Sequence, residues 1–253
     1  MSHPAPLRKI ILHYHLFKNA GTSVDQVLQQ NFGSRWVTRE FQHRGNPAVH
    51  RKEVAEWIVA HPDACAFSSH TLELPPPQID GVEILPVIFI RHPIDRIVSA
   101  YSFERRQGGD GFGSVLARHT SLMGYIEVRL SLWRDRQCRD FHVDRFAPMF
   151  PADSGTELQR ASRAVAALPF VGVVEEFAAS MAQLQRLLRH AFPDFAVHTV
   201  HANASRDVEA PLSQRLDKLK AEIGDACFAD LLANNRDDLL LHQQALDRLK
   251  SGA

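Results

Sequence analysis

The chain of 253 residues carries 29 Lys and Arg residues and 29 Asp and Glu residues, so its formal net charge is zero. This balance gives no overall attraction to nucleic acid or to a membrane surface, and no nucleic-acid partner is expected. With 45% hydrophobic and 23% charged residues, the composition is that of an ordinary folded globule. The length suits one α/β domain over residues 1–253, with a flexible N-terminus over residues 1–8.

The three cysteines, Cys65, Cys138 and Cys227, are widely spaced and form no C-x-x-C pair. Their odd number and spacing predict neither a disulfide framework nor a zinc site, and they fit a reducing compartment. The N-terminus lacks the apolar core of a signal peptide, and no stretch approaches the roughly 18 apolar residues of a spanning helix. We therefore expect a cytoplasmic protein without a membrane span.

The most informative stretch covers residues 9–27. An apolar, β-prone run over residues 10–17 predicts a buried strand. The chain breaks at residues 18–21, and apolar residues then recur at helical spacing from Val24 to Leu28. The pattern therefore predicts a strand, a tight glycine turn and a helix.

Such a turn can hold an anion, because a helix N-terminus presents unpaired N–H groups and partial positive charge. The amides of Gly21, Thr22 and Ser23, the two hydroxyls and the Lys18 ammonium would bind phosphate or sulfate, and the hydroxyls could also cap the helix. A Walker loop has its lysine directly after the last glycine, whereas here Thr22 follows Gly21. The pattern favours one short anion over a triphosphate with Mg²⁺. The alternative is an ordinary strand–turn–helix connection that binds no ligand and leaves the lysine in solvent.

A second candidate group is an imidazole. Residues 31–45 are polar and aromatic and either line a cleft beside the anion loop or form a solvated loop. A helix is expected over residues 51–60 and a short buried strand over residues 64–67. His70 follows that strand, where the ends of parallel strands face the ligand crevice. His70 is thus a candidate acid or base, the alternative being a surface role like that of most of the 14 histidines.

A third group follows the β-branched run at residues 87–90, which predicts a central parallel strand. Pro93 suits the first turn of an amphipathic helix, and Arg96 and Ser99 lie off its apolar face. Arg91 and Ser99 can therefore converge on an anion, for which a guanidinium offers a planar fork. The alternative is a capping arginine beside a solvated helix face.

The rest of the chain is predicted to be mostly helical. After a glycine-rich loop at residues 107–113, the segment 133–149 has no clear period and is rich in arginine. It either contacts an anionic or polyhydroxyl acceptor or forms a solvated loop; its polar residues are Arg134, Arg136, Gln137, Arg139 and Arg145. The further expected elements are helices over residues 114–132, 158–167, 177–190 and 212–250, a strand over residues 170–174 and a polar turn at residues 203–206.

Taken together, four segments resemble the sulfotransferases that use 3′-phosphoadenosine 5′-phosphosulfate (PAPS), in the branch of heparan sulfate 2-O-sulfotransferase and its bacterial relatives. They are residues 18–23, residues 69–70, residues 91–101 and residues 171–177. The resemblance extends from about Ile10 to residues 235–239. It implies a P-loop-like parallel β-sheet flanked by α-helices, with a helical C-terminal part.

By this resemblance the protein is a PAPS-dependent O-sulfotransferase, acting without a metal on a carbohydrate or glycolipid hydroxyl. The residues implied to bind the 5′-phosphosulfate are Lys18, Asn19, Ala20, Gly21, Thr22 and Ser23. Arg91 and Ser99 would bind the 3′-phosphate, Lys18 would stabilise the leaving oxygen, and His70 would be the base. Relatives often have Pro where Phe17 stands and Thr where Asn19 stands.

Three alternatives remain open from the sequence. The same loop could serve a nucleotide or small-molecule kinase, which would require Mg²⁺ and ATP. The acceptor could be a tyrosine side chain or a small metabolite. The chain could also be a nucleotide-binding protein without catalytic activity. The oligomeric state is not predicted.

Overall fold

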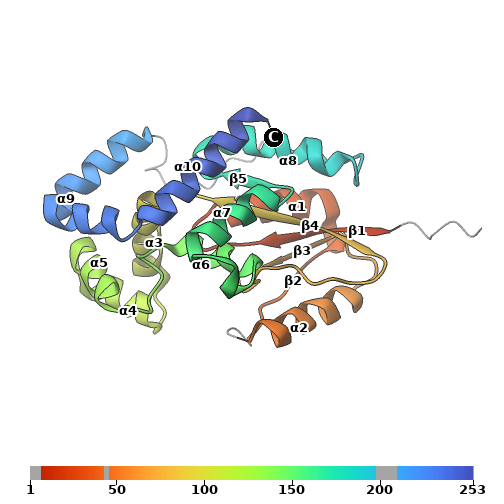
Figure 1. Ribbon diagram of the computed structural model, residues 1–253, viewed down its shortest axis with the longest axis horizontal. Coiled ribbons are helices and arrows are strands. Elements are labelled where there is room, and N and C mark those ends of the chain that lie inside the picture. The colour runs from red at the N-terminus through yellow and green to blue at the C-terminus, as the bar shows by residue number, and fades with distance from the viewer. Residues whose placement is uncertain (1–6, 43–45, 198–209, 253) are drawn as a thin grey trace, which may run out of the picture.

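A parallel β-sheet of five strands forms the centre of the computed structural model, which describes residues 7–42, 46–197 and 210–252 (Figure 1). The strand order is β2-β3-β1-β4-β5, and all four neighbouring pairs are parallel. The strands are β1 (Arg8–Tyr14), β2 (Trp36–Thr38), β3 (Ala66–Ser69), β4 (Val82–Ile90) and β5 (Val171–Val173). In the register of the sheet, Ile11 lies opposite Ala66 and Leu85.

Helices follow or precede every strand. They are α1 (Gly21–Phe32), α2 (Pro47–Val59), α3 (Pro93–Gln107), α4 (Phe112–His119), α5 (Leu122–Ser131), α6 (Phe141–Phe146), α7 (Glu157–Ala167), α8 (Phe177–Arg189), α9 (Leu212–Ala233) and α10 (Arg236–Ser251). The predicted α/β fold with a parallel sheet, flanking helices and a helical C-terminal part is therefore confirmed.

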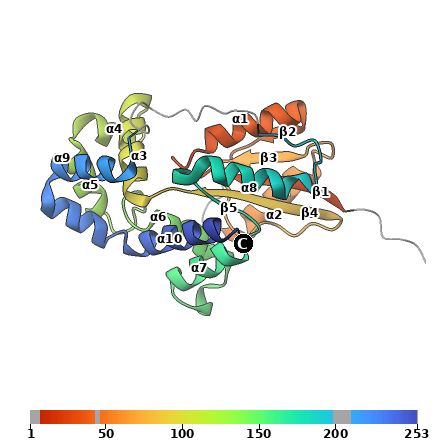
Figure 2. The same cartoon turned by 90° about the horizontal axis from the view of Figure 1, so that it is seen from above.

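Three apolar clusters hold these layers together. Ile10 and Leu12 of β1 belong to a cluster that α2, α6, α7 and α10 complete on one face of the sheet. Ile11 points to the opposite face, as alternation along a strand requires, and packs with α1 and α8. A third cluster joins α3, α4, α5 and α9 beyond the carboxyl ends of the strands (Figures 1 and 2). The sheet therefore ends against a helical layer on that side.

The first strand and helix differ in detail from the prediction. β1 begins at Arg8 and ends at Tyr14. The prediction of a flexible N-terminus over residues 1–8 is therefore wrong at Arg8, whose guanidinium donates to the carbonyl oxygens of Ile58, His61 and Ala64 at 2.6–3.2 Å. α1 begins at Gly21 and has no side-chain cap. The expectation that the hydroxyls of Thr22 and Ser23 cap this helix is thus wrong, because Ala20, with a left-handed backbone conformation, occupies the N-cap position.

Other differences are local. The short strand β2 was not predicted. The single helix expected over residues 114–132 is divided into α4 and α5, because Ser121 caps the start of α5 by accepting from the Gly124 amide at 3.2 Å. The polar turn expected at residues 203–206 lies outside the described residues. None of the described helices is long and apolar enough to cross a membrane.

Candidate functional site

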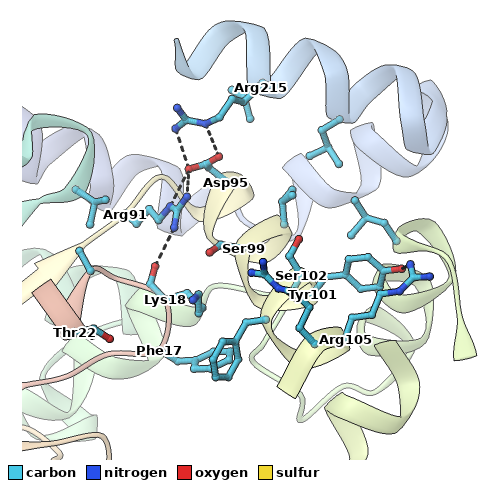
Figure 3. A pocket seen from close by; sticks show the side chains of 18 of the residues that line it. Phe17, Lys18, Thr22, Arg91, Asp95, Ser99, Tyr101, Ser102, Arg105 and Arg215 are labelled. Carbon is cyan, nitrogen blue, oxygen red and sulfur yellow. Dashed lines mark hydrogen bonds and ion pairs between the residues drawn. The ribbon is translucent and has the colours of Figure 1, made fainter. Parts of the chain in front are cut away.

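A cavity of about 1020 Å³ lies at the carboxyl ends of the strands, between the sheet and the layer of α3, α5 and α9 (Figure 3). Four of its lining residues are the first residues after four strands: His15 after β1, His70 after β3, Arg91 after β4 and Val174 after β5. This is the edge at which parallel sheets bind ligands. The predicted site residues that line the cavity are Lys18, Ala20, Gly21, Thr22, Ser23, His70, Arg91 and Ser99. Three separate segments of the chain therefore meet here.

The loop before α1 has an uncommon backbone. Lys18 and Ala20 have φ angles of 63° and 60°, in the left-handed region that non-glycine residues rarely adopt. Arg91 supports this conformation from the neighbouring strand, because its Nη1 donates to the Lys18 carbonyl oxygen at 3.4 Å. The loop and the end of β4 are thus joined directly.

Asn19 does not line the cavity, contrary to its predicted role in donor binding. Its side chain is buried beneath the loop, where Nδ2 donates to the Phe17 carbonyl at 2.9 Å. Its Oδ1 lies 2.9 Å from Nε2 of His142, and Nδ1 of His142 lies 2.9 Å from the Asp238 carboxylate. The buried chain Asn19, His142 and Asp238 therefore anchors the loop to α6 and α10.

At the start of α1, the Ser23 amide already donates to the Ala20 carbonyl at 3.0 Å. Within the described chain, the amides of Gly21 and Thr22 have no such partner, so they are the ones available to an anion. The Nζ of Lys18 lies 4.6 Å from the centre of the Phe103 ring. Burial lowers the pKa of Lys18, and the positive charges of Arg91 and Arg106 lower it further.

Arg91 and Arg215 share one carboxylate. Arg91 Nε donates to Asp95 at 2.8 Å, and Arg215 of α9 donates to both oxygens of Asp95 at 2.8 and 2.9 Å (Figure 3). Burial alone would raise the pKa of Asp95, but the hydrogen bonds and charges of Arg215 and Arg91 hold it below its ordinary value. One negative charge thus orients two guanidinium groups, and a net positive charge remains.

Positive charge is concentrated in this cavity although the whole chain is neutral. Its cationic lining residues are Lys18, Arg91, Arg105, Arg106, Arg215 and Lys218, and its carboxylates are Asp95 and Glu222. The helical layer adds an apolar wall from Val98, Leu122, Leu216 and Leu219. A cavity lined by both cations and apolar side chains suits a ligand that combines anionic groups with a ring.

His70 lies at the exposed rim of the cavity and is bound by Glu40, which precedes it by 30 residues. The distance from His70 Nδ1 to Glu40 Oε1 is 2.6 Å, and the His70 amide donates to the same oxygen at 3.2 Å. Burial alone would raise the pKa of Glu40, but hydrogen bonds from His70 outweigh this and lower it. A carboxylate that accepts the Nδ1 proton leaves Nε2 to exchange protons with a ligand.

Behind His70 lies a second group of ionisable side chains. His13 and His15 place their Nδ1 atoms 2.8 Å from the two oxygens of Asp25. Donor atoms of these three residues lie within 4.8 Å of one another, close enough to ligate one cation. In the structure both imidazoles hydrogen bond to the Asp25 carboxylate.

The arginine-rich segment at residues 133–149, for which acceptor contact and a solvated loop were the two expectations, contributes no residue to this cavity. It forms a separate hollow of about 350 Å³ with Arg134, Arg136 and Arg145 in its lining. Arg136 pairs with Glu157 at 2.9 Å, and Arg139 donates to Asn234 at 3.0 Å. The arginines of this segment are thus engaged largely in structural contacts.

Sequence reasoning missed Glu40, His15 and Asp25 as site residues, and Arg215 on α9. His13 and His15 stand two residues apart, which puts both on one face of a strand, and Asp25 stands at the start of the next helix. That spacing could have indicated their contact. No local pattern marks Arg215, because only the packing of α9 against α3 brings it to Asp95.

No known family model matches the chain. The chain is 41% identical over 253 residues to an uncharacterized protein of Archaeoglobus fulgidus, with 97% of this chain and 99% of the relative covered. The two proteins therefore belong to the same family.

Proposed function

From the chemistry of this cavity we propose that the protein is a sulfotransferase that moves a sulfuryl group from PAPS to an acceptor hydroxyl. One observation carries the proposal: two anion-binding elements open into the same cavity. They are the start of α1 with Lys18 and the arginine pair Arg91 and Arg215. A donor with two separated anionic groups on a nucleoside requires such a pair of elements.

The proposed binding mode follows from these positions. The amides of Gly21 and Thr22, with the Lys18 ammonium, bind the 5′-phosphosulfate at the helix start. Arg91 and Ser99 bind the 3′-phosphate, and the shared Asp95 keeps the guanidinium of Arg91 in place. The apolar wall of the cavity accommodates the ring of the donor.

The proposed reaction is an in-line displacement. The acceptor oxygen forms a bond to sulfur while the bond from sulfur to the bridging phosphate oxygen breaks, so negative charge develops on that oxygen. Lys18 stabilises the developing charge, a role that metal ions share in nucleotide kinases. His70 accepts the acceptor proton at Nε2 while Glu40 holds the Nδ1 proton.

For the acceptor we propose a carbohydrate or glycolipid hydroxyl, as the resemblance implies. The exposure of His70, 57% of its side chain, supports a bulky acceptor, because the base is reached from the open rim. For the location we propose the cytoplasm. The three cysteines are free, which supports a reducing compartment.

The proposal is tested by incubating the protein with radiolabelled PAPS and a panel of glycans, glycolipids and tyrosine peptides. We expect label transfer to a glycan or glycolipid in the presence of EDTA. Transfer to the tyrosine peptides alone would support sulfuryl transfer, but it would show that the acceptor is a tyrosine side chain and not a carbohydrate. Phosphate transfer from ATP with Mg²⁺, without any sulfuryl transfer, would replace the reaction with that of a kinase.

A further inference from the structure

Behind the rim of the cavity, two histidines at the end of β1 face a carboxylate of α1. His13 and His15 stand two residues apart, so alternation along the strand places both imidazoles on one face. Their rings are stacked at an angle of 28°, with centroids 5.5 Å apart. Asp25 belongs to α1, the helix that follows the strand. A strand and a helix therefore bring together three side chains that commonly bind metals.

The donor atoms of these side chains have nearly the spacing of a metal site. Nδ1 of His13 lies 2.8 Å from Oδ1 of Asp25, and Nδ1 of His15 lies 2.8 Å from Oδ2. In a tetrahedral zinc site, with bonds of about 2.0–2.1 Å, neighbouring ligand atoms lie roughly 3.3 Å apart. An increase of about half an ångström in each distance would therefore admit an ion.

Neighbouring groups hold both imidazoles in place. A Cβ atom built on Gly21 would lie 2.0 Å from Cδ2 of His15, so the absence of a side chain there makes room for the ring. The ring of His70 packs against the same imidazole, with centroids 3.9 Å apart. Ser68 of β3 places its Oγ 3.2 Å from Nδ1 of His13. Ligands that are oriented by such outer contacts lose little freedom when they bind a metal.

The burial and charge of the three side chains also suit a divalent cation. The exposed fraction is 1% for the His13 side chain, 11% for His15 and 17% for Asp25, so little water competes for the donor atoms. The carboxylate offsets part of the charge of the ion, and imidazole ligands favour transition metals over Mg²⁺ and Ca²⁺. The positive end of α1 acts against a cation, so we expect a dissociation constant of roughly 1 μM.

We propose that His13, His15 and Asp25 bind one divalent transition-metal ion such as Zn²⁺, through the two Nδ1 atoms and the carboxylate. The ion links the end of β1 to α1 and so joins the two ends of the loop at residues 16–20. Its role is to stabilise this loop, in which Lys18 and Ala20 have left-handed backbone conformations. The proposed sulfuryl transfer uses none of the three ligands, so the metal site does not rest on the proposed function.

The test is the binding of Zn²⁺ to the full-length protein, after a chelator has removed any metal and gel filtration has removed the chelator. Titration calorimetry should show one site with a dissociation constant of roughly 1 μM or lower. Free Zn²⁺ at about 100 times that constant should raise the melting temperature by about 5 °C or more. Co²⁺ should occupy the same site and develop visible absorption bands.

Two variants each change one ligand. His15→Gln removes an imidazole and Asp25→Asn removes the negative charge, and each should weaken Zn²⁺ binding by at least about 100-fold. His61→Gln is the matched control, because His61 bonds the Trp57 carbonyl at 2.8 Å and should keep the wild-type affinity. Circular dichroism shows whether each variant is folded. If His15→Gln does not fold, Asp25→Asn decides the matter, because it preserves the shape of the side chain.

Equal Zn²⁺ affinity in the wild type and in both ligand variants would overturn the inference and place the ion on other side chains. Failure of Zn²⁺ and Co²⁺ to bind the wild type more tightly than about 100 μM would overturn it as well. A separate titration with 3′-phosphoadenosine 5′-phosphate (PAP), the desulfated product, distinguishes this inference from the proposed function. PAP binding without a metal site would leave the donor class intact, whereas a metal site without PAP binding would support the ion and reject the donor.

Discussion

The Nδ1 atom of His70 lies 2.6 Å from Oε1 of Glu40, and these two side chains come from neighbouring strand ends of the sheet. If His70 is the base, His70→Ala should lower kcat by roughly 10²-fold to 10⁴-fold, the usual contribution of general base catalysis. Glu40→Gln should lower kcat by at least about 10-fold, because the amide no longer fixes the Nδ1 proton. Both variants should bind PAP within about 2-fold of the wild type, since neither residue belongs to the two anion-binding elements.

The control for this experiment is Glu56→Gln. Glu56 is an exposed residue of α2 that pairs with Lys52 at 3.8 Å, outside the cavity. Its turnover should equal that of the wild type. Unchanged turnover in both His70→Ala and Glu40→Gln would remove the pair from the mechanism.

The surroundings of Lys18 predict an alkaline limit to activity. Its pKa is lowered by burial and by the charges of Arg91 and Arg106. The protonated form stabilises the leaving oxygen, so activity is present below this pKa and is lost as the pH rises through it. In Arg106→Gln the pKa of Lys18 rises, and the alkaline limb of the rate profile should move up by roughly half a pH unit, as expected for one partly screened charge.

Arg105→Gln provides the comparison for that limb. Arg105 also lines the cavity, but its Nη1 donates to the Tyr101 hydroxyl at 2.7 Å and its charge does not lower the pKa of Lys18. The alkaline limb of the rate profile of Arg105→Gln should therefore stay at the pH seen in the wild type. A limb that shifts equally in both arginine variants, or in neither, would contradict the assignment to Lys18.

The buried chain beneath the loop predicts a stability effect. Asp238 accepts hydrogen bonds from His142 and Val143, and Asp238→Asn should lower the free energy of unfolding by about 1–3 kcal/mol, because buried donors lose a charged acceptor. Burial alone would raise the pKa of Asp238, but His142 outweighs this and lowers it. The stabilisation is therefore complete above the unfolded pKa and is lost as the pH falls through the folded pKa.

Urea unfolding measures this effect. The difference between wild type and Asp238→Asn should be constant above about pH 5 and shrink as the pH falls below about 4. Asp237→Asn is the neighbouring control on α10 and should change the free energy of unfolding by less than about 1 kcal/mol. A constant difference down to the lowest measurable pH would show that the carboxylate charge does not contribute.

Gly21→Ala tests the packing of the helix start. The new methyl group would meet the His15 ring at 2.0 Å, so either the ring or the loop must move. We expect PAP binding to weaken by at least about 10-fold, comparable to the loss of one charge-assisted hydrogen bond. Gly124→Ala, whose methyl group would have only ordinary contacts from 3.4 Å outward, should bind PAP like the wild type. Equal binding by both alanine variants would place the anion away from the start of α1.

Local patterns predicted the α/β fold and the segments that bring Lys18, His70 and Arg91 to the cavity, because these residues stand shortly after strand ends. Arg91 and Ser99 lie within one strand–helix unit, so their place in the same cavity follows from helical spacing. β2 escaped prediction because it is a three-residue strand at the edge of the described sheet, where it pairs with β3. Its pairing nevertheless leads the chain to Glu40, two residues beyond its end.

The remaining site residues depend on tertiary packing. Arg215 reaches Asp95 across 120 residues, and Glu40 reaches His70 across 30. Asn19 looked like a ligand-binding residue because it stands between Lys18 and Ala20. A left-handed residue on each side of it turns its side chain into the core, and neither φ angle could be inferred from the residue types.

The central claim is that the cavity binds the PAPS nucleotide, and titration of the wild-type protein with PAP in the presence of EDTA tests it most directly. The account predicts micromolar or tighter binding, a free energy of about −8 kcal/mol or more favourable. Arg91→Ala should weaken this binding strongly. No binding of PAP, together with ATP binding that appears only when Mg²⁺ is added, would contradict the account and indicate a kinase-like site.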